Sequence, residues 1–184
     1  MKKVVITIIG PDRPGIIASV SETLFQLECN IENISQTLLQ SAFAGIYVVS
    51  VPESMDSDEL QQAIHSNLSD QHLLVVVMPH HAETRDFNKS PVESFIVTTS
   101  GPDQKGLVSK ISRVIADHNA NITNLAAVFK GGDDPDRNIM VYEIDVPVTT
   151  DIGRLSENLK NKASENGLEL TLQHKNIFDA VNRI

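Results

Sequence analysis

The chain has few of the residues that mark secreted, membrane-spanning or disulfide-bonded proteins. Its 184 residues contain one cysteine, Cys29, so no disulfide can form within the chain, and this usage suits a reducing cytoplasm. No apolar run approaches the roughly 20 residues that a membrane-spanning helix needs. Residues 1–4 lead into a β-branched run without a small-residue cleavage site, which favours a first strand over a signal peptide. We therefore expect a cytoplasmic protein in which Cys29 is a partly buried packing residue.

Positive charge is also scarce. The 15 lysine and arginine residues are outnumbered by 24 acidic residues, and the net charge at pH 7 is −9. A nucleic-acid-binding protein needs clustered lysine and arginine to contact phosphates, and the sequence has no basic face, zinc-finger spacing or helix-turn-helix signature. These absences argue against direct binding of nucleic acid. Any control over a gene would have to act through another protein.

Motifs for catalysis and for metal binding are missing as well. The sequence contains no GxSxG, HExxH, CxxC or Walker motif. His80 and His81 are adjacent, so they cannot face one metal as two residues one helical turn apart would. The acidic run 133–138 matches the first half of a calcium loop, but Ile139 stands where glycine is required and Asp145 where glutamate closes the loop. We expect no metal and no cofactor, and we interpret 133–138 as a solvated hairpin loop.

The most informative feature that is present is an internal repeat. Residues 10–15, Gly-Pro-Asp-Arg-Pro-Gly, recur as residues 101–106, Gly-Pro-Asp-Gln-Lys-Gly. Residues 30–34, Asn-Ile-Glu-Asn-Ile, recur as residues 121–125, Asn-Ile-Thr-Asn-Leu. Both pairs are separated by 91 positions (101 − 10 and 121 − 30). A shared offset for two separate motifs indicates that the chain is a duplication of one small unit.

Hydrophobic periodicity predicts the same order of elements in both halves. The first half is expected to hold strands over 4–9, 31–39, 43–51 and 73–78, with helices opening at Pro14 and at Asp56. The second half is expected to hold strands over 95–99, 122–129, 140–146 and 168–172, with helices around 107–115 and 152–159 and a stop at Gly167. The β-branched strand 4–9 is expected to be buried on both faces.

The order βαββαβ is that of a ferredoxin-like α+β fold. Each unit is therefore expected to be a four-stranded antiparallel sheet with two helices on one face, leaving the other face or an edge for a partner. We place the first unit at residues 1–79 and the second at 92–175. Residues 80–91 are interpreted as a polar linker, and residues 176–184 as a tail or short amphipathic helix.

The strand-to-helix loop at residues 10–15 is the first candidate binding element. Amide groups at a helix N-terminus point outward, and the helix dipole adds partial positive charge, so a small carboxylate or phosphate could bind there. Gly15 would let a ligand approach the backbone closely. Asp12 is well placed to cap the helix, which is a purely structural role.

Asn30 and Asn121, at the turn from the first helix to the second strand of each unit, are the second candidates. An asparagine in that place can adopt a left-handed turn conformation, which needs no ligand. Its amide also offers a donor and an acceptor, so it can contact either end of an amino-acid zwitterion. The sequence leaves both interpretations open.

Together these motifs resemble a known family. The segment 12–16, Asp-Arg-Pro-Gly-Ile, followed by Asn30-Ile31, is similar to the ACT domain, a regulatory module that binds small amino acids. The resemblance covers both units. Two such units without another domain resemble the glycine cleavage system transcriptional repressor family. This resemblance implies a protein that senses glycine and acts on a DNA-binding activator, without being an enzyme.

The resemblance also implies a set of ligand-binding residues. In the first unit they are Asp12, Arg13, Pro14, Gly15, Ile16, Asn30 and Ile31; in the second they are Asp103, Gly106, Leu107, Asn121 and Ile122. The implied site lies at the seam between units, within the chain or across a homodimer, with Asp12 facing Asn121 and Asp103 facing Asn30. Known binders carry a neutral asparagine where Asp12 stands, and a carboxylate would favour the ammonium group of a ligand.

Two other functions fit parts of the sequence. A ferredoxin-like fold with an anion-binding loop also describes acylphosphatases, whose arginine and asparagine pair could be imitated by Arg13 with Asn30 or Asn33. Arg13 has no counterpart in the second unit, where Gln104 and Lys105 replace Arg13 and Pro14. The third possibility is a ligand-free interaction module in which the loops only cap helices. A phosphatase assay and calorimetry with glycine, serine and alanine would separate the three.

Overall fold

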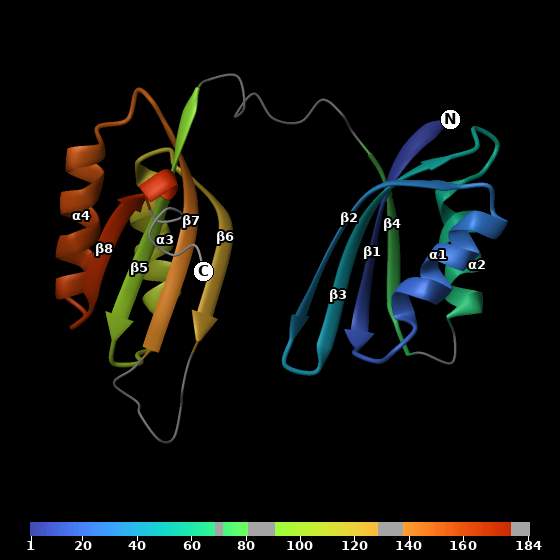
Figure 1. The fold of residues 1–184 in the computed structure, drawn as a ribbon, viewed down its shortest axis with the longest axis horizontal. Helices are drawn as coiled ribbons and strands as arrows, with labels where there is room; N and C mark the ends of the chain where they lie inside the picture. The colour runs from blue at the N-terminus through green and yellow to red at the C-terminus, as the bar shows by residue number, and fades with distance from the viewer. Residues whose placement is uncertain (69–71, 81–90, 129–137, 178–184) are drawn as a thin grey trace. The chain divides into compact units, whose positions relative to one another are not determined.

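The computed structural model describes residues 1–68, 72–80, 91–128 and 138–177, which form two compact units (Figure 1). The first unit contains β1 (Lys2–Pro11), α1 (Ile16–Gln26), β2 (Asn30–Leu39), β3 (Ala42–Val51), α2 (Ser57–Asn67) and β4 (Leu74–Pro79). The second contains β5 (Val92–Gly101), α3 (Leu107–Asp117), β6 (Asn121–Val128), β7 (Asn138–Pro147), α4 (Ile152–Ser164) and β8 (Glu169–His174). The predicted βαββαβ order is confirmed in both units.

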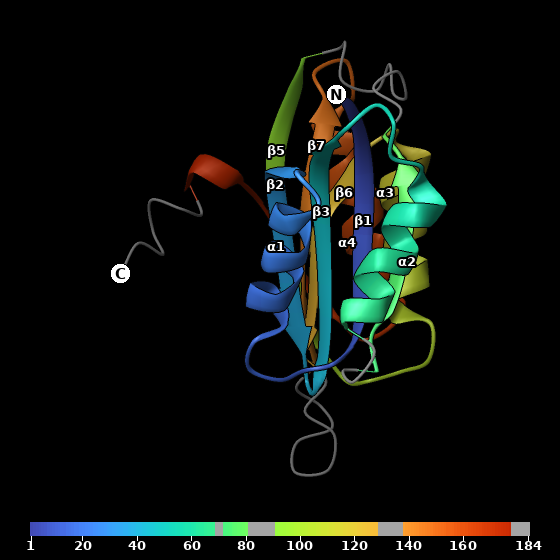
Figure 2. The same cartoon turned by 90° about the vertical axis from the view of Figure 1, so that its right-hand side faces the viewer.

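Each unit has one antiparallel sheet with its helices on one face. The strand orders are β2-β3-β1-β4 and β6-β7-β5-β8, so the first strand of each unit lies inside its sheet. In Figure 2, α1 and α2 run side by side in front of the first sheet. The two units divide between Thr84 and Arg85, inside the expected linker, and the exact domain boundaries stay predictions. Among the described residues, no helix is both long and apolar enough to cross a membrane.

The hydrophobic core of each unit lies between the sheet and its two helices. In β1, Val4, Ile6 and Ile8 are buried beneath the helices, whereas Ile9 keeps 45% of its surface exposed. The prediction that residues 4–9 are buried on both faces is therefore wrong. The reason is that both helices of the unit cover the same face, so the alternate side chains of the strand point to the other side.

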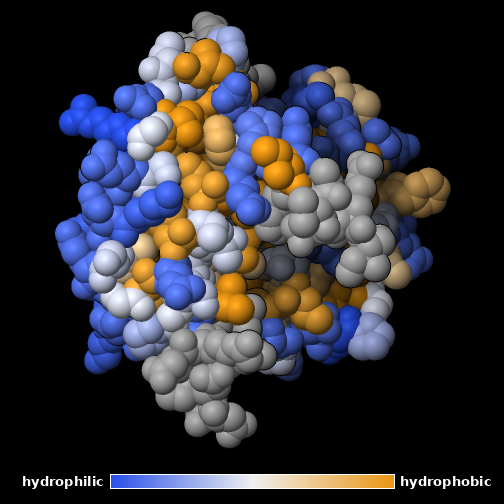
Figure 3. All heavy atoms as spheres, turned by 60° about the vertical axis from the view of Figure 1, so that its left-hand side comes forward, coloured by the Kyte–Doolittle hydropathy of each residue, from blue (hydrophilic) through white to orange (hydrophobic). Residues whose placement is uncertain are grey.

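The uncovered face of the first sheet is rich in apolar side chains. Its exposed large apolar residues include Ile9, Leu39, Ile46, Leu74, Val76 and Met78. Ile34 and Leu38 of β2 are also exposed, but they pair with the buried Tyr47 and Phe43 and therefore lie on the helix face. Figure 3 shows another face of the molecule, where apolar residues also reach the surface among hydrophilic ones. Within the first unit the two helices leave this apolar sheet face uncovered, and a partner for it stays a prediction.

Both loop-to-helix turns depend on glycine. Gly15 and Gly106 are the N-cap residues of α1 and α3, with φ of 96° and 86°, and neither helix has a side-chain cap. The structure thus corrects two predictions, because α1 begins at Ile16 rather than at Pro14, and Asp12 does not cap it. An added Cβ at Gly15 would meet nothing within 4 Å, so it is the left-handed backbone that favours glycine there.

Asn30 and Asn121 do not form left-handed turns. The residues with positive φ before β2 and β6 are Glu28 (56°) and Asn119 (57°), and the two candidate asparagines are the first residues of their strands. The purely conformational interpretation of Asn30 and Asn121 is therefore wrong. Both side chains are exposed and neither makes a hydrogen bond to another described residue.

Cys29 is half-buried, and its Sγ lies 3.4 Å from the carbonyl oxygen of Leu27. Burial raises the pKa of its thiol, as suits a packing residue. Asn138, expected in a solvated loop, is instead the first residue of β7 and only 2% exposed.

Residues 133–137, His81 and residues 178–184 lie outside the described ranges. Within those ranges, no three His, Cys, Asp or Glu side chains gather closely enough to hold a metal ion.

The two buried tyrosines provide a test of the core. Tyr47 is fully buried and its hydroxyl has no partner among the described residues, whereas the Tyr142 hydroxyl lies 3.5 Å from the sulfur of Met140. We expect Tyr47→Phe to raise the free energy of unfolding by about 1 kcal/mol, because it removes an unpaired buried polar group. Tyr142→Phe, the matched control, should not stabilise the protein. Urea denaturation measures both, and a loss of stability in Tyr47→Phe would contradict the prediction.

Candidate functional site

A hollow of about 550 Å³ lies against the first glycine loop. It is lined by Asp12, Arg13, Gly15, Ile16, Ile17 and Ala18 from the loop and the first turn of α1, by Gln36, Thr37 and Leu38 from β2, and by Phe43 from β3. Four residues that the resemblance assigns to a ligand site therefore line one surface hollow, and Pro14 of the same loop does not. Phe43 is 4% exposed and Ile16 is 2% exposed, so the inner wall of this hollow is apolar.

The polar part of this hollow comes from the helix terminus. The first amide groups of α1 have no intrahelical acceptors, no side chain caps them, and no acidic residue lies in the first turn. The Asp12 N–H donates to the carbonyl oxygen of Ser41 at 2.8 Å, which ties the loop to the β2–β3 turn. Arg13 is half-buried along the wall. Free amides, the positive end of a helix dipole and a guanidinium favour a bound carboxylate or phosphate.

Asn30 does not lie in this hollow. Asn30 pairs with Ser50, which pairs with Lys3 at the start of β1, whereas the loop follows Pro11 at the other end of the same strand. With a rise of roughly 3.3 Å per residue, the two ends are about 25 Å apart. Within one unit, Asp12 and Asn30 therefore cannot contact the same small ligand.

The second unit has the same separation. Asn121 pairs with Asp145, which pairs with Ser94, while the second loop follows Gly101 at the far end of β5. Asp103 and Asn121 are therefore not brought together within this unit either. The expected pairs, Asp12 with Asn121 and Asp103 with Asn30, stay predictions.

The two isoleucines beside these asparagines are packing residues. Ile31 and Ile122 are half-buried against the cores of their units. A β-bulge follows each of them, between Ile31 and Asn33 and between Ile122 and Asn124. The bulge leaves one extra residue in the strand, which in the first unit is Glu32.

Two charged networks near these bulges were missed by sequence reasoning. Glu32 accepts hydrogen bonds from Lys3 and Ser50. In the second unit, Glu143 accepts hydrogen bonds from Lys175 and, at 3.1 Å, from the side-chain amide of Asn124. These donors lower the pKa of both carboxyl groups below the ordinary glutamate value of 4.5. No local sequence signal pairs residues 18 to 32 positions apart, because the pairing depends on strand register.

The Glu143 network predicts a dependence of stability on pH. Because the folded-state pKa of Glu143 is lowered, its contribution is fully present above pH 4.5 and is lost as the pH falls through the lowered value. We expect Glu143→Gln to reduce the free energy of unfolding at pH 7 by at most about 1 kcal/mol, since the pair is partly exposed. The control is Glu93→Gln, at an exposed residue of β5. Urea denaturation from pH 7 to 3 should show the Glu143→Gln deficit shrinking below pH 4.5, and a deficit that persists at pH 3 would contradict this origin.

The second glycine loop is held differently from the first. The Gln104 side chain, which replaces Arg13, donates to the carbonyl oxygen of Asn166 at 2.9 Å. The Asn166 amide in turn accepts from Lys110 and donates to the carbonyl oxygen of Lys162 at 2.8 Å. Of the predicted ligand residues here, Leu107 is 2% exposed and belongs to the core, so its backbone amide rather than its side chain is available.

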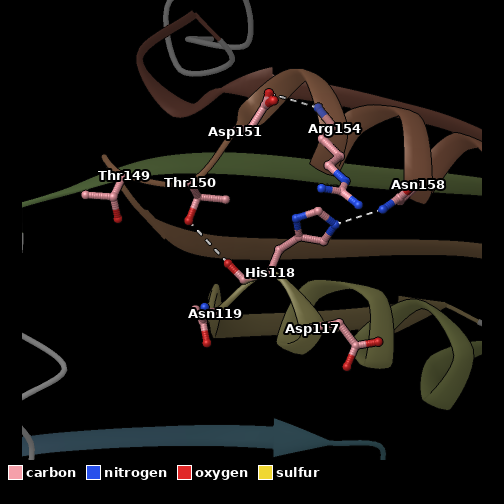
Figure 4. A pocket seen from close by; sticks show the side chains of 8 residues that line it. All are labelled: Asp117, His118, Asn119, Thr149, Thr150, Asp151, Arg154 and Asn158. Atoms are coloured by element: carbon pink, nitrogen blue, oxygen red, sulfur yellow. Dashed lines mark hydrogen bonds between the residues drawn. The ribbon is translucent and has the colours of Figure 1, made fainter.

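A further hollow, of about 520 Å³, lies between the end of α3 and the start of α4 (Figure 4). The His118 ring contacts the Asn158 amide at 3.0 Å, the Thr150 hydroxyl donates to the carbonyl oxygen of His118 at 3.2 Å, and Asp151 accepts from the Arg154 N–H at 3.1 Å. The first contact joins the end of α3 to α4, the second joins it to the loop before α4, and the third caps the N-terminus of α4. None of the residues that the sequence assigned to a ligand site lines this hollow.

Comparison with known proteins identifies relatives of both units. The sequence model of the ACT domain matches residues 2–78 and 93–173. A UPF0237 protein of Methanopyrus kandleri is 44% identical over 68 residues, which cover 34% of this chain and 76% of that protein. A UPF0237 protein of Clostridium perfringens is 29% identical over 90 residues, 48% of this chain and 97% of that protein.

Two solved structures resemble the whole chain. An unknown protein of Galdieria sulphuraria has a TM-score of 0.75 and 22% identity, covering 94% of this chain and 98% of its own. A proposed glycine cleavage system transcriptional repressor has a TM-score of 0.70 and 17% identity, with coverages of 94% and 96%. At these identities the likeness concerns the fold, and it extends over both units.

Proposed function

Because the chain belongs to the ACT domain family of regulatory modules, we propose that it binds a small amino acid, glycine first, and transmits that signal to a protein partner. The observation that carries the proposal is the uncapped N-terminus of α1, which opens into a hollow of about 550 Å³ beside Arg13. An uncapped helix terminus is a favourable place for the carboxylate of an amino acid.

The charges around the loop support a zwitterion as the ligand. The backbone N–H groups of Ile16 and Ile17 point out of the N-terminal end of α1 and would donate hydrogen bonds to the ligand carboxylate. Asp12 lines the same hollow and would attract the ligand ammonium group. A simple anion would gain from the amides but would be repelled by Asp12, so a molecule that carries both charges is favoured.

We propose that the partner is a DNA-binding activator of glycine cleavage genes. The net charge of −9 disfavours direct contact with DNA, so a regulator of this kind would act through another protein. A structure similar over 94% of the chain is that of a proposed glycine cleavage system transcriptional repressor. The proposed role is regulatory and not enzymatic.

The acylphosphatase-like alternative gains no support from the geometry of the first unit. It needs Arg13 beside Asn30 or Asn33. Asn30 is aligned with Lys3, and Asn33 pairs with Val48, which is aligned with Val5, whereas Arg13 follows the far end of β1. A hydrolytic pair built from these residues is not assembled within the unit.

The proposed function is tested by a thermal-shift screen of the twenty amino acids, followed by calorimetry. A ligand present at about a hundred times its dissociation constant should raise the free energy of unfolding of the unit that it binds by roughly 2.7 kcal/mol. Acetate and methylamine serve as controls, because each carries only one of the two charges and should bind much more weakly than glycine. The absence of any stabilising amino acid would overturn the sensor function and favour a ligand-free interaction module.

A further inference from the structure

The helix layers of the two units carry opposite charge. In the second unit, α3 and α4 contain five lysine or arginine residues and two acidic residues, a net charge of +3. In the first unit, α1 and α2 contain three acidic residues and neither lysine nor arginine, a net charge of −3. The positive layer stands out because the whole chain carries −9. Sequence patterning missed this surface, because its cations lie on two helices that are distant along the chain.

The difference includes two charge reversals at equivalent positions. Arg113 in α3 stands 91 positions after Glu22 in α1, which is the offset of the repeat. Arg154 is the third residue after the N-cap aspartate of α4, and Glu59 is the third residue after the N-cap aspartate of α2. A glutamate in the first turn is favoured by the positive end of the helix dipole, whereas an arginine there is disfavoured. Helix stability therefore does not account for Arg154.

Both arginines line a groove between α3 and α4. Three adjoining hollows, of about 520, 310 and 540 Å³, share lining residues and follow the two helices. At one end, Lys110 donates to the side-chain oxygen of Asn166, and at the other, Thr150 donates to the carbonyl oxygen of His118. The 11 residues of α3 span roughly 16 Å, which is the length of about five residues of extended chain.

The acidic side chains of this groove are mostly engaged within the protein. Glu165 forms an ion pair with Lys162 at 2.6 Å, and the N-cap aspartate of α4 caps that helix. The side chains of Arg113 and Arg154 are exposed, and neither forms an ion pair or a hydrogen bond with another described residue. In Figure 4 the Arg154 guanidinium extends from α4 toward the end of α3. Among the described lining residues, Asp117 is the one carboxylate left to oppose these two cations.

We propose that the groove between α3 and α4 is a docking surface for an acidic segment of a partner protein. Carboxylates of the segment pair with Arg113 and Arg154, and its backbone N–H groups donate to Asp117 and to the side-chain oxygen of Asn158. Nucleic acid fits less well, because its closely spaced phosphates would be repelled by Asp117 and by the overall charge of −9. Complementary charges of this kind steer a partner and fix its register.

This surface is separate from the proposed amino-acid site. None of the residues assigned to that site lines the groove. The inference therefore goes beyond the proposed function and does not depend on the binding of glycine. A thermal-shift screen without any stabilising amino acid would leave the docking surface unaffected.

The test is fluorescence anisotropy of a labelled peptide of alternating glutamate and alanine, titrated with the full chain. The same peptide with glutamine in place of glutamate is the reference and should bind much more weakly. Arg113→Glu and Arg154→Glu should each weaken binding of the acidic peptide about five- to tenfold, because an attractive pair becomes a repulsive one. Lys160→Glu makes the same charge change at an exposed residue of α4 that lines none of the three hollows, and should weaken binding less than about twofold.

Melting temperatures of the three variants report the fold. Arg154→Glu should not lower the melting temperature, because a carboxylate in the first turn of α4 is favoured by the helix dipole. Equal binding of the acidic and glutamine peptides would overturn the inference. An equal loss of affinity in Lys160→Glu would overturn it as well, because the attraction would then be diffuse rather than seated in the groove. Tighter binding of a labelled single-stranded oligonucleotide than of the acidic peptide would reassign the surface to nucleic acid and reject the acidic protein segment.

Discussion

Replacing Leu24 with alanine is expected to lower the free energy of unfolding of the first unit by about 2–5 kcal/mol. Leu24 is fully buried at the centre of the core between α1 and the sheet, so the substitution removes apolar contacts and leaves a cavity. Units of this size have small cores, and such a loss is a large part of their total stability. Hydrogen exchange of the β1 amides measures the effect in the first unit directly.

The adjacent residue gives a matched control. Phe25 is larger than Leu24 and belongs to the same helix, but 80% of its surface is exposed. Phe25→Ala should therefore change the free energy of unfolding by less than about 0.5 kcal/mol. Equal losses from Leu24→Ala and Phe25→Ala would mean that Phe25 is covered in solution, and the division of α1 into a buried and an exposed face would be wrong.

The substitutions Asn30→Ala and Asn121→Ala are expected to weaken amino-acid binding while leaving the fold nearly unchanged. Both residues begin a strand, both side chains are exposed, and neither makes a hydrogen bond to another described residue. Replacing either asparagine by alanine should therefore lower the free energy of unfolding only slightly. If each amide pairs with ligand, its removal leaves a ligand polar group unpaired, which costs about 1–3 kcal/mol, or roughly five- to hundredfold in affinity.

Measuring both quantities on the same samples separates ligand binding from folding. Calorimetry gives the affinity for glycine, and the melting temperature reports the fold. Asn119→Ala serves as a control, because Asn119 holds a left-handed conformation and its replacement should lower the melting temperature instead. An unchanged affinity in both Asn30→Ala and Asn121→Ala would exclude these residues from the ligand site and leave the loops as the candidate.

Several structural features could not be predicted from the sequence, because they depend on strand register. The acidic run 133–138 predicts a solvated loop that includes Asn138, whereas the pairing of β7 with β5 buries Asn138 opposite Gly101. Thr99 gave no signal, because a threonine in a strand is ordinary. The partnership of Glu143 with Lys175 joins residues 32 positions apart. Each depends on which strands lie side by side.

The sequence by itself determined the duplication, the βαββαβ order of both units and the glycine-containing loops that precede α1 and α3, because repeats, apolar periodicity and turn residues act locally along the chain. Only the tertiary structure decided that the loop and Asn30 stand at opposite ends of the first sheet, and that the second unit has polar groups where the first has Ile8 and Phe43. The physical reason is that burial and proximity come from packing one helical layer on one sheet face, which no short stretch of residues encodes.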